Sequence, residues 1–183
     1  YRYVRNSPTN IVDPSGLVIM SVPSPRNPCI PQKVTDIQMA IQSACNLINS
    51  PNTCIGSRLL QCLTNVCSGN IMFQCMGNCT SSNCAYTLTY DQHGMLLTPR
   101  QIGPRCSATN PPGTTNKTII TFCGNRFPNC GTGGTPTSTA LHELIHMCNL
   151  DHNNNPGVFE ACERDCFGVP VRVRPANCPC DCT

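Results

Sequence analysis

The sequence predicts a single α+β domain that is rich in disulfides and contains a small sheet. Two stretches have the spacing of amphipathic helices, at residues 35–49 and 55–67. Two others alternate in the manner of strands, at residues 86–90 and 117–123. Cysteine accounts for 17 of the 183 residues, a density that is typical of disulfide-braced folds.

The first helix is predicted to begin at a capping box, Thr35-Asp36-Ile37-Gln38, and to end near Asn49. Its apolar face consists of Ile37, Ile41, Ala44 and Ile48. The second helix has an apolar face formed by Leu59, Leu60, Leu63 and Val66, and Gly69 ends it. Residues 72–84 are interpreted as a loop or short helix held by cysteines, and residues 158–166 and 169–173 as a short helix and a strand.

A third helix carries the residues with the clearest chemistry. His142-Glu143-Leu144-Ile145-His146 is an H-E-x-x-H pattern. On a helix, His142 and His146 project from one face, so both imidazoles can bind one zinc ion. Glu143 is not a ligand, but it can take a proton from a zinc-bound water, whose pKa the metal lowers to about 7. The pattern indicates a zinc metallopeptidase.

The ends of this helix also have sequence signals. Thr135-Pro136 supplies an N-cap and a proline at the first helical position. Asn149 suits a left-handed helix end. The helix is therefore predicted to run from about Pro136 to Cys148, after a flexible connection at residues 131–134.

The third protein ligand has several candidates. His152 lies six residues after His146 and can fold back toward it. Glu160 is the alternative, because a helix doubling back from residue 158 would bring it level with His146. Glu163, Asp151 or a position filled only by water are the remaining candidates.

The region around these residues resembles the metzincin zinc peptidases, H-E-x-x-H-x-x-G-x-x-H. Asn149-Leu150-Asp151-His152 is similar to the G-L-D/E-H of matrix metalloproteinases, and Asn155-Pro156-Gly157 to the D-P-G that follows in them. No methionine follows Met147, so the Met-turn of metzincins is missing. Glu160-Ala161 is similar to the E-A-x-x-D of gluzincins, with Arg164 in place of the aspartate.

These resemblances imply a zincin-like fold with zinc as cofactor. They also imply that the strand before the zinc helix, residues 117–123, is an edge strand to which a substrate peptide adds by β-augmentation. Tyr86 and Tyr90 are candidates for stabilising the oxyanion.

A second resemblance lies at the start of the chain. Residues 3–17 read Y-V-R-N-S-P-T-N-I-V-D-P-S-G-L and are similar to the end of the Rhs repeat-associated core domain. In that family the motif closes a shell of YD repeats, and a variable C-terminal toxin follows it. The shell cuts itself just after this motif by means of aspartates. The resemblance implies that Asp13 is one cleavage residue and that Leu17–Val18 is the scissile bond.

The organisation expected from both resemblances has three parts. Residues 1–17 are the tail of an Rhs shell, and residues 33–183 are the toxin domain, long enough to bury a core. Residues 18–32, with prolines at 23, 25, 28 and 31, are a linker that sits in neither a helix nor a central strand. Tyr1 is not an initiator, so the chain is expected to be a fragment or a processed product.

Composition narrows the partners and the compartment. The net charge is only +3 and there is no basic run, which argues against nucleic acid as a partner. No stretch approaches 18 consecutive apolar residues, so no membrane span is predicted. The cysteines form no paired C-x-x-C knuckles, which favours disulfides and an oxidising compartment. Cys148, within the zinc helix, is predicted to be a buried free thiol.

The sequence therefore predicts a zinc metallopeptidase, secreted or delivered into a target cell as an Rhs toxin. The implied partners are a protein substrate, the encapsulating shell and an immunity protein. The alternatives are a cell-wall amidase or nuclease with the same ligands, or a non-catalytic disulfide-rich binding module.

Overall fold

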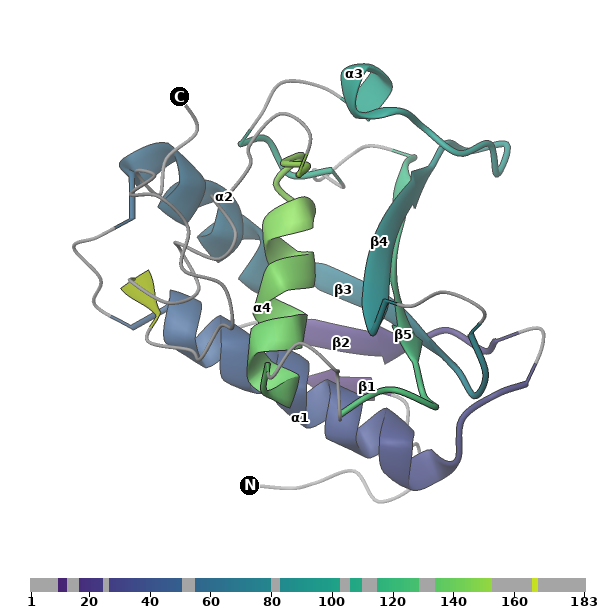
Figure 1. The fold of residues 1–183 in the computed structure, drawn as a ribbon. Helices are drawn as coiled ribbons and strands as arrows, with labels where there is room; N and C mark the ends of the chain where they lie inside the picture. Colours follow the sequence, from purple (N-terminus) through teal and green to yellow (C-terminus); the bar gives the residue numbers. More distant parts are fainter. Residues whose placement is uncertain are drawn as a thin grey trace.

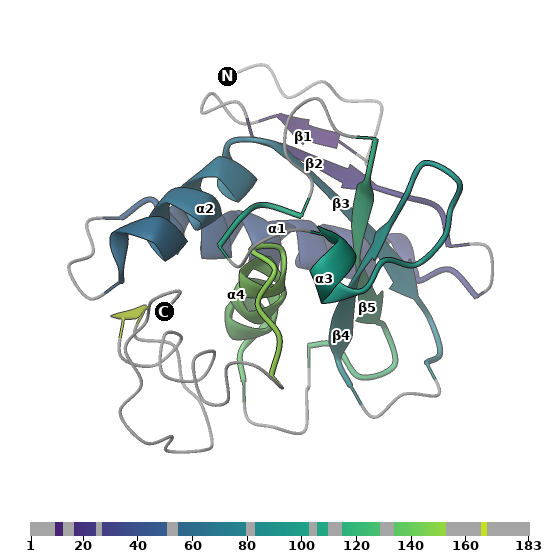
Figure 2. The same ribbon diagram turned by 90° about the horizontal axis from the view of Figure 1, so that it is seen from above.

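A mixed five-stranded sheet forms one layer of the molecule, and helices cover one of its faces (Figures 1 and 2). The computed structural model describes residues 10–12, 17–24, 27–50, 55–79, 83–102, 106–109, 115–128, 134–152 and 166–167. Within these residues, the arrangement confirms a mixed α+β domain with a small sheet.

The strand order is β1-β2-β3-β5-β4. The strands are β1 (Asn10–Val12), β2 (Val18–Ser21), β3 (Asn70–Met76), β4 (Ala85–Tyr90) and β5 (Lys117–Cys123). β2, β3 and β5 are parallel to one another, whereas β1 and β4 pair antiparallel at the two edges.

The predicted linker at residues 18–32 is wrong at both of its ends. Val18–Ser21 form β2, which pairs with β1 on one side and β3 on the other. Leu17 and Ile19 are fully buried in the core. Pro31 begins a helix, because its fixed φ and missing N–H are compatible with the first helical position. The prolines therefore exclude neither a helix that begins at Pro31 nor a strand in the apolar residues before Pro23.

The first helix, α1 (Pro31–Ile48), begins before the predicted capping box. Thr35 lies inside the helix, where its hydroxyl donates to the Pro31 carbonyl at 3.3 Å instead of capping. The predicted apolar face is confirmed, since Ile37, Ile41, Ala44 and Ile48 are all buried. α2 (Ser57–Cys67) is also confirmed, with Leu59, Leu63 and Val66 buried.

Residues 70–76 contradict the prediction of a loop or short helix over residues 72–84. They form β3, a central strand whose Ile71, Phe73 and Cys75 are buried. β3 pairs in parallel with β5, with Phe73 opposite Ile120. The alternation of apolar and polar residues is weak in this strand because Met72 and Met76, between and beyond the buried residues, are also apolar.

Both strands predicted from alternation, β4 and β5, are confirmed. The expected edge position of β5 is wrong, because β5 lies between β3 and β4. β4 is the edge strand of the described sheet on this side, and it lies beside the helix α4 (Pro136–His146). A short helix, α3 (Pro99–Ile102), follows β4.

The core lies between the sheet and the helices. Phe122 of β5 makes edge-to-face contacts with Phe73 and Phe127, at ring-centroid distances of 6.2 and 5.3 Å. α1 packs along α4, and α2 packs against both α1 and β3. α4 is therefore held between α1 and the edge strand β4.

Disulfides tie these layers together. The pairs are Cys29–Cys75, Cys45–Cys67, Cys62–Cys148 and Cys79–Cys123, and Cys84, Cys106 and Cys166 are also disulfide-bonded. The prediction that Cys148 is a free thiol is wrong, because the end of α4 lies against α2 and brings Cys148 to Cys62. These bonds fit a protein that folds in an oxidising compartment.

The predicted strand at residues 169–173 and, apart from Cys166, the predicted helix at residues 158–166 lie outside the described residues. Within the described part of the chain, none of the helices has the length and apolar character needed to cross a membrane.

Candidate metal centre

The helix α4 has the beginning that its sequence predicts. The Thr135 hydroxyl accepts a hydrogen bond from the Ser138 N–H at 3.1 Å, and Pro136 occupies the first helical position. The helix ends at His146, two residues earlier than predicted. Asn149 then adopts the left-handed conformation, with φ of +54°, as its sequence position indicated.

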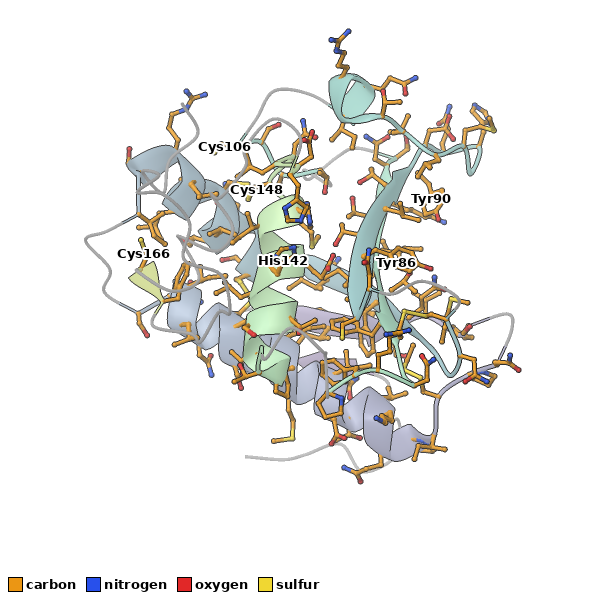
Figure 3. All side chains as sticks on the ribbon, viewed as in Figure 1. Tyr86, Tyr90, Cys106, His142, Cys148 and Cys166 are labelled. Carbon is orange, nitrogen blue, oxygen red and sulfur yellow. A yellow bond between two sulfur atoms is a disulfide. The ribbon has the colours of Figure 1, made fainter. Side chains whose placement is uncertain are left out.

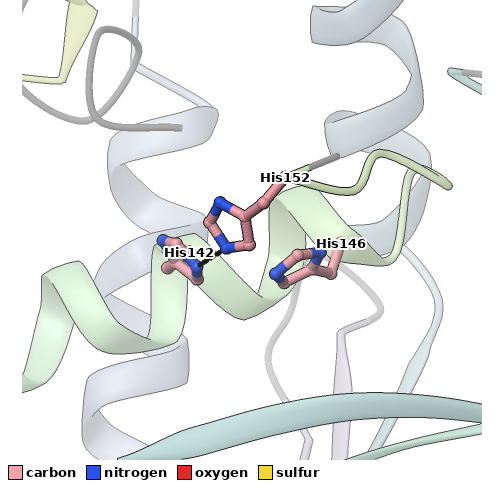
Figure 4. Close-up of side chains that lie close together, drawn as sticks. All are labelled: His142, His146 and His152. Carbon is pink, nitrogen blue, oxygen red and sulfur yellow. Dashed lines mark hydrogen bonds between the residues drawn. The ribbon is translucent and has the colours of Figure 1, made fainter. Parts of the chain in front are cut away.

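Three histidines converge beside this helix end (Figure 4). His142 and His146 come from α4, and His152 returns from the segment that follows it. The Nε2 atoms of His142 and His152 are 3.0 Å apart. One ring nitrogen from each of the three residues lies within 4.8 Å of the others. Of the candidate third ligands that the structure describes, His152 is thus the one that joins the cluster.

The tautomer of His146 is set by a backbone acceptor. Its Nδ1 atom lies 2.8 Å from the Leu150 carbonyl oxygen, which can only accept, so Nδ1 donates. The Nε2 atom then carries the lone pair that a metal requires. Burial, and then the nearby His142, lower the pKa of His146 from 6.5 to about 3, so the ring is neutral at physiological pH.

The segment between the second and third histidines is attached to the loop at residues 106–109. Cys106 N–H donates to the Cys148 carbonyl at 2.9 Å, and Thr109 N–H donates to the Met147 carbonyl at 2.8 Å. These bonds satisfy two backbone carbonyls of the turn that follows the helix. They also fix the direction in which the chain leaves α4 toward His152.

A chain of buried hydroxyls connects this loop to the sheet. The Thr118 hydroxyl donates to Thr109 at 2.9 Å. Because each hydroxyl has one hydrogen, Thr89 must then donate to Thr118, at 3.0 Å. The three side chains are at most 4% exposed, so the bonds are shielded from water. β4 and β5 therefore support the loop that holds the His152 segment, a link that no motif in the sequence indicates.

Glu143 is buried, with 4% of its surface exposed, although it is charged in its ordinary form. The Thr87 hydroxyl of β4 lies 2.6 Å from its Oε2 atom. A buried carboxylate needs such donors, because burial without hydrogen bonds is costly. The alternation of strand residues predicts that Thr87 lies on one face of β4. It does not predict that this face packs against Glu143.

Tyr86 and Tyr90 project to the opposite face of β4, away from His142 (Figure 3). Neighbouring residues of a strand point to opposite faces, and Thr87 faces α4. The Tyr86 hydroxyl instead lies 3.7 Å from the Met76 sulfur. Their proposed role with the oxyanion is therefore wrong.

The donor set fits a zinc ion. Two imidazole nitrogens on one tetrahedral zinc, at about 2.0–2.1 Å each, lie about 3.3 Å apart. The 3.0 Å between the Nε2 atoms of His142 and His152 is close to this spacing, and a ring nitrogen of His146 lies within 4.8 Å of the other two ligand atoms. Three imidazoles with one open position are a known ligand set of catalytic zinc.

The remaining predicted site residues are Glu160, Glu163, Asp13 and Leu17. Glu160, Glu163 and Asp13 lie outside the described residues. Leu17 is fully buried directly before β2, and the Val18 N–H donates to the Gly69 carbonyl at 3.2 Å. The predicted scissile bond thus joins a core residue to a strand of the sheet.

Comparison with models of known protein families, with curated proteins and with solved structures finds no match to this chain.

Proposed function

We propose that this chain is a zinc-dependent metallopeptidase. The observation that carries the proposal is the convergence of His142, His146 and His152, with the buried Glu143 next to His142 in the same helix. Three imidazole ligands and a nearby base are the arrangement that metal-assisted hydrolysis requires.

The histidines and Glu143 would have different roles in hydrolysis. The three histidines would hold zinc, which when bound supplies an acidified water and a Lewis acid for the substrate carbonyl. Glu143 is not among the ligand atoms of the cluster, so its carboxylate is kept for proton transfer. It would accept a proton from water and pass it to the leaving amine.

The edge of β4 is where a peptide substrate would bind. The Cys84 carbonyl accepts from Cys123 in the direction of β5, whereas the Thr89 carbonyl accepts from Leu97 on the other side. Backbone groups alternate in direction along a strand, so those of Ala85 and Thr87 point to the same side as Thr89. An extended peptide could add to them by β-augmentation, next to the histidines.

The biological setting is proposed from the Rhs resemblance of residues 3–17. The domain would be the C-terminal toxin of an Rhs protein, enclosed by the shell and released by cleavage at Leu17–Val18, with Asp13 taking part. Its target would be a protein of the recipient cell, and the producer would carry an immunity protein. The disulfides favour delivery into an oxidising compartment.

The test combines metal analysis with hydrolysis assays on one preparation. We expect one zinc per chain and cleavage of peptide bonds, with both lost in His146→Ala. His93→Ala is the matched control, because His93 is exposed in the turn after β4 and outside the cluster. Zinc with cleavage of only cell-wall amides or phosphodiesters would replace the peptidase by another hydrolase. A chain that binds no zinc would favour a binding module.

A further inference from the structure

Thr87 lies between the side chain of Glu143 and the edge of β4 at which a peptide is proposed to bind. It lies in the middle of β4, opposite Ile120 of β5. Its hydroxyl is 2.6 Å from Glu143 Oε2 and 3.3 Å from the Glu143 carbonyl oxygen. A donor at 2.6 Å from a carboxylate is in the range of charge-assisted O–H···O bonds. The hydroxyl hydrogen is therefore directed to the carboxylate.

This contact is rigid for two reasons. Thr87 is β-branched, so its χ1 angle is restricted and the strand backbone decides where the hydroxyl lies. The backbone itself is paired with β5 across all six residues of β4. Glu143 has a longer side chain with more rotatable bonds, and the hydrogen bond from Thr87, together with the burial of Glu143, favours one of its rotamers.

The same residue presents its backbone N–H and carbonyl to the outer side of β4, as the alternation from Thr89 shows. A peptide that bonded there would be positioned by Thr87, while the base would be positioned by the hydroxyl of the same residue. The substrate backbone and the Glu143 carboxylate would then both be positioned relative to the same residue.

We propose that Thr87 is a positioning residue that holds the Glu143 carboxylate in the orientation needed for proton transfer to a peptide bound along β4; this inference rests on the proposed function. Oε2 can accept from Thr87 and still take part in proton transfer, because a carboxylate oxygen offers more than one lone pair. Misplacing a reacting group by about 1 Å can cost up to about 100-fold in rate. Removing the hydroxyl should therefore affect turnover.

The experiment compares Thr87→Val, which keeps the shape and the backbone bonds, with Thr87→Ser, which keeps the hydroxyl. We expect Thr87→Val to retain one zinc per chain and an unchanged KM, with kcat lowered about 10-fold or more. Thr87→Ser should restore kcat to within about threefold, because the hydroxyl can still reach Oε2. Thr87→Ala is a second hydroxyl-free variant in case the valine variant does not fold.

Tyr86→Phe is the matched control, since it removes a hydroxyl from the neighbouring residue of the same strand on the opposite face. It should leave kcat and KM unchanged. An active wild type whose kcat is the same in Thr87→Val and Thr87→Ala would overturn the role of Thr87 alone. A loss that serine does not restore would also overturn it. A zinc-loaded wild type that cleaves no peptide would overturn the proposed function and this role together.

Discussion

Cys62 of α2 is joined by a disulfide to Cys148, which lies between His146 and His152 in the chain. The bond spans 86 residues of sequence and fastens the turn after α4 to a second helix. On its other side, the same turn receives hydrogen bonds from Cys106 and Thr109. The approach of the third histidine to the other two therefore depends on attachments to both α2 and the sheet.

Removal of this disulfide should weaken zinc binding. In Cys62→Ser combined with Cys148→Ser, the turn is freed from α2, so His152 is held less firmly and we expect zinc affinity to fall about 10-fold or more, on the scale of other supporting contacts. Zinc titration against a competing chelator measures this. Cys45→Ser with Cys67→Ser is the control, because it removes a disulfide between α1 and the end of α2. Both double variants should lose about 2–4 kcal/mol of stability, but only Cys62→Ser with Cys148→Ser should lose zinc affinity. Equal affinities would contradict the coupling.

Glu143→Gln should separate metal binding from catalysis. The amide is nearly the same size and Glu143 is outside the ligand set, so zinc content should stay at the wild-type level. Because an amide cannot accept the proton, turnover should fall about 100-fold or more, the scale of general-base catalysis. Metal analysis and peptide cleavage on the same sample check both points. Full activity in this variant would exclude Glu143 as the base.

The identity of the third ligand can be tested by two alanine variants. We expect His152→Ala to lower zinc affinity by at least about 100-fold, since even supporting residues contribute 10–100-fold. Glu160→Ala should bind zinc as the wild type does. Dialysis against buffered zinc, followed by elemental analysis, gives the affinities. The reverse result would assign the third position to Glu160, as in gluzincins.

The depressed pKa of His146 predicts a pH-dependent stability of the metal-free protein. The folded value is about 3 and the ordinary value is 6.5, so the unfolded chain binds more protons between these pH values. The contribution of the neutral His146 to the free energy of unfolding is complete above about pH 6.5 and is lost as the pH falls toward 3. His146→Asn does not titrate and can still donate to the Leu150 carbonyl. Urea unfolding at pH 7 and pH 4.5 should show a smaller acid loss in His146→Asn, and equal losses would refute the assignment.

The local features of the site could be predicted from sequence because they depend on neighbours along the chain. Thr135 caps α4 through a residue three positions away, and Asn149 ends it through its own backbone preference. The spacing of His142 and His146 puts them on one face of any helix. The alternation of β4 and β5 likewise depends on adjacent residues.

Tertiary structure alone decided the contacts between distant segments. β4 instead of β5 forms the edge of the described sheet, and residues expected to be a linker form β2. Thr87 reaches Glu143 across 56 residues, and Cys62 reaches Cys148 across 86. Such pairs depend on how strands order themselves and how helices pack on them, and local propensity contains no information about that order. The sequence by itself thus determined a helix that carries two histidines and a glutamate. Packing of this helix against β4 decided which residue holds the glutamate, and packing against α2 decided what fastens the turn that leads to the third histidine.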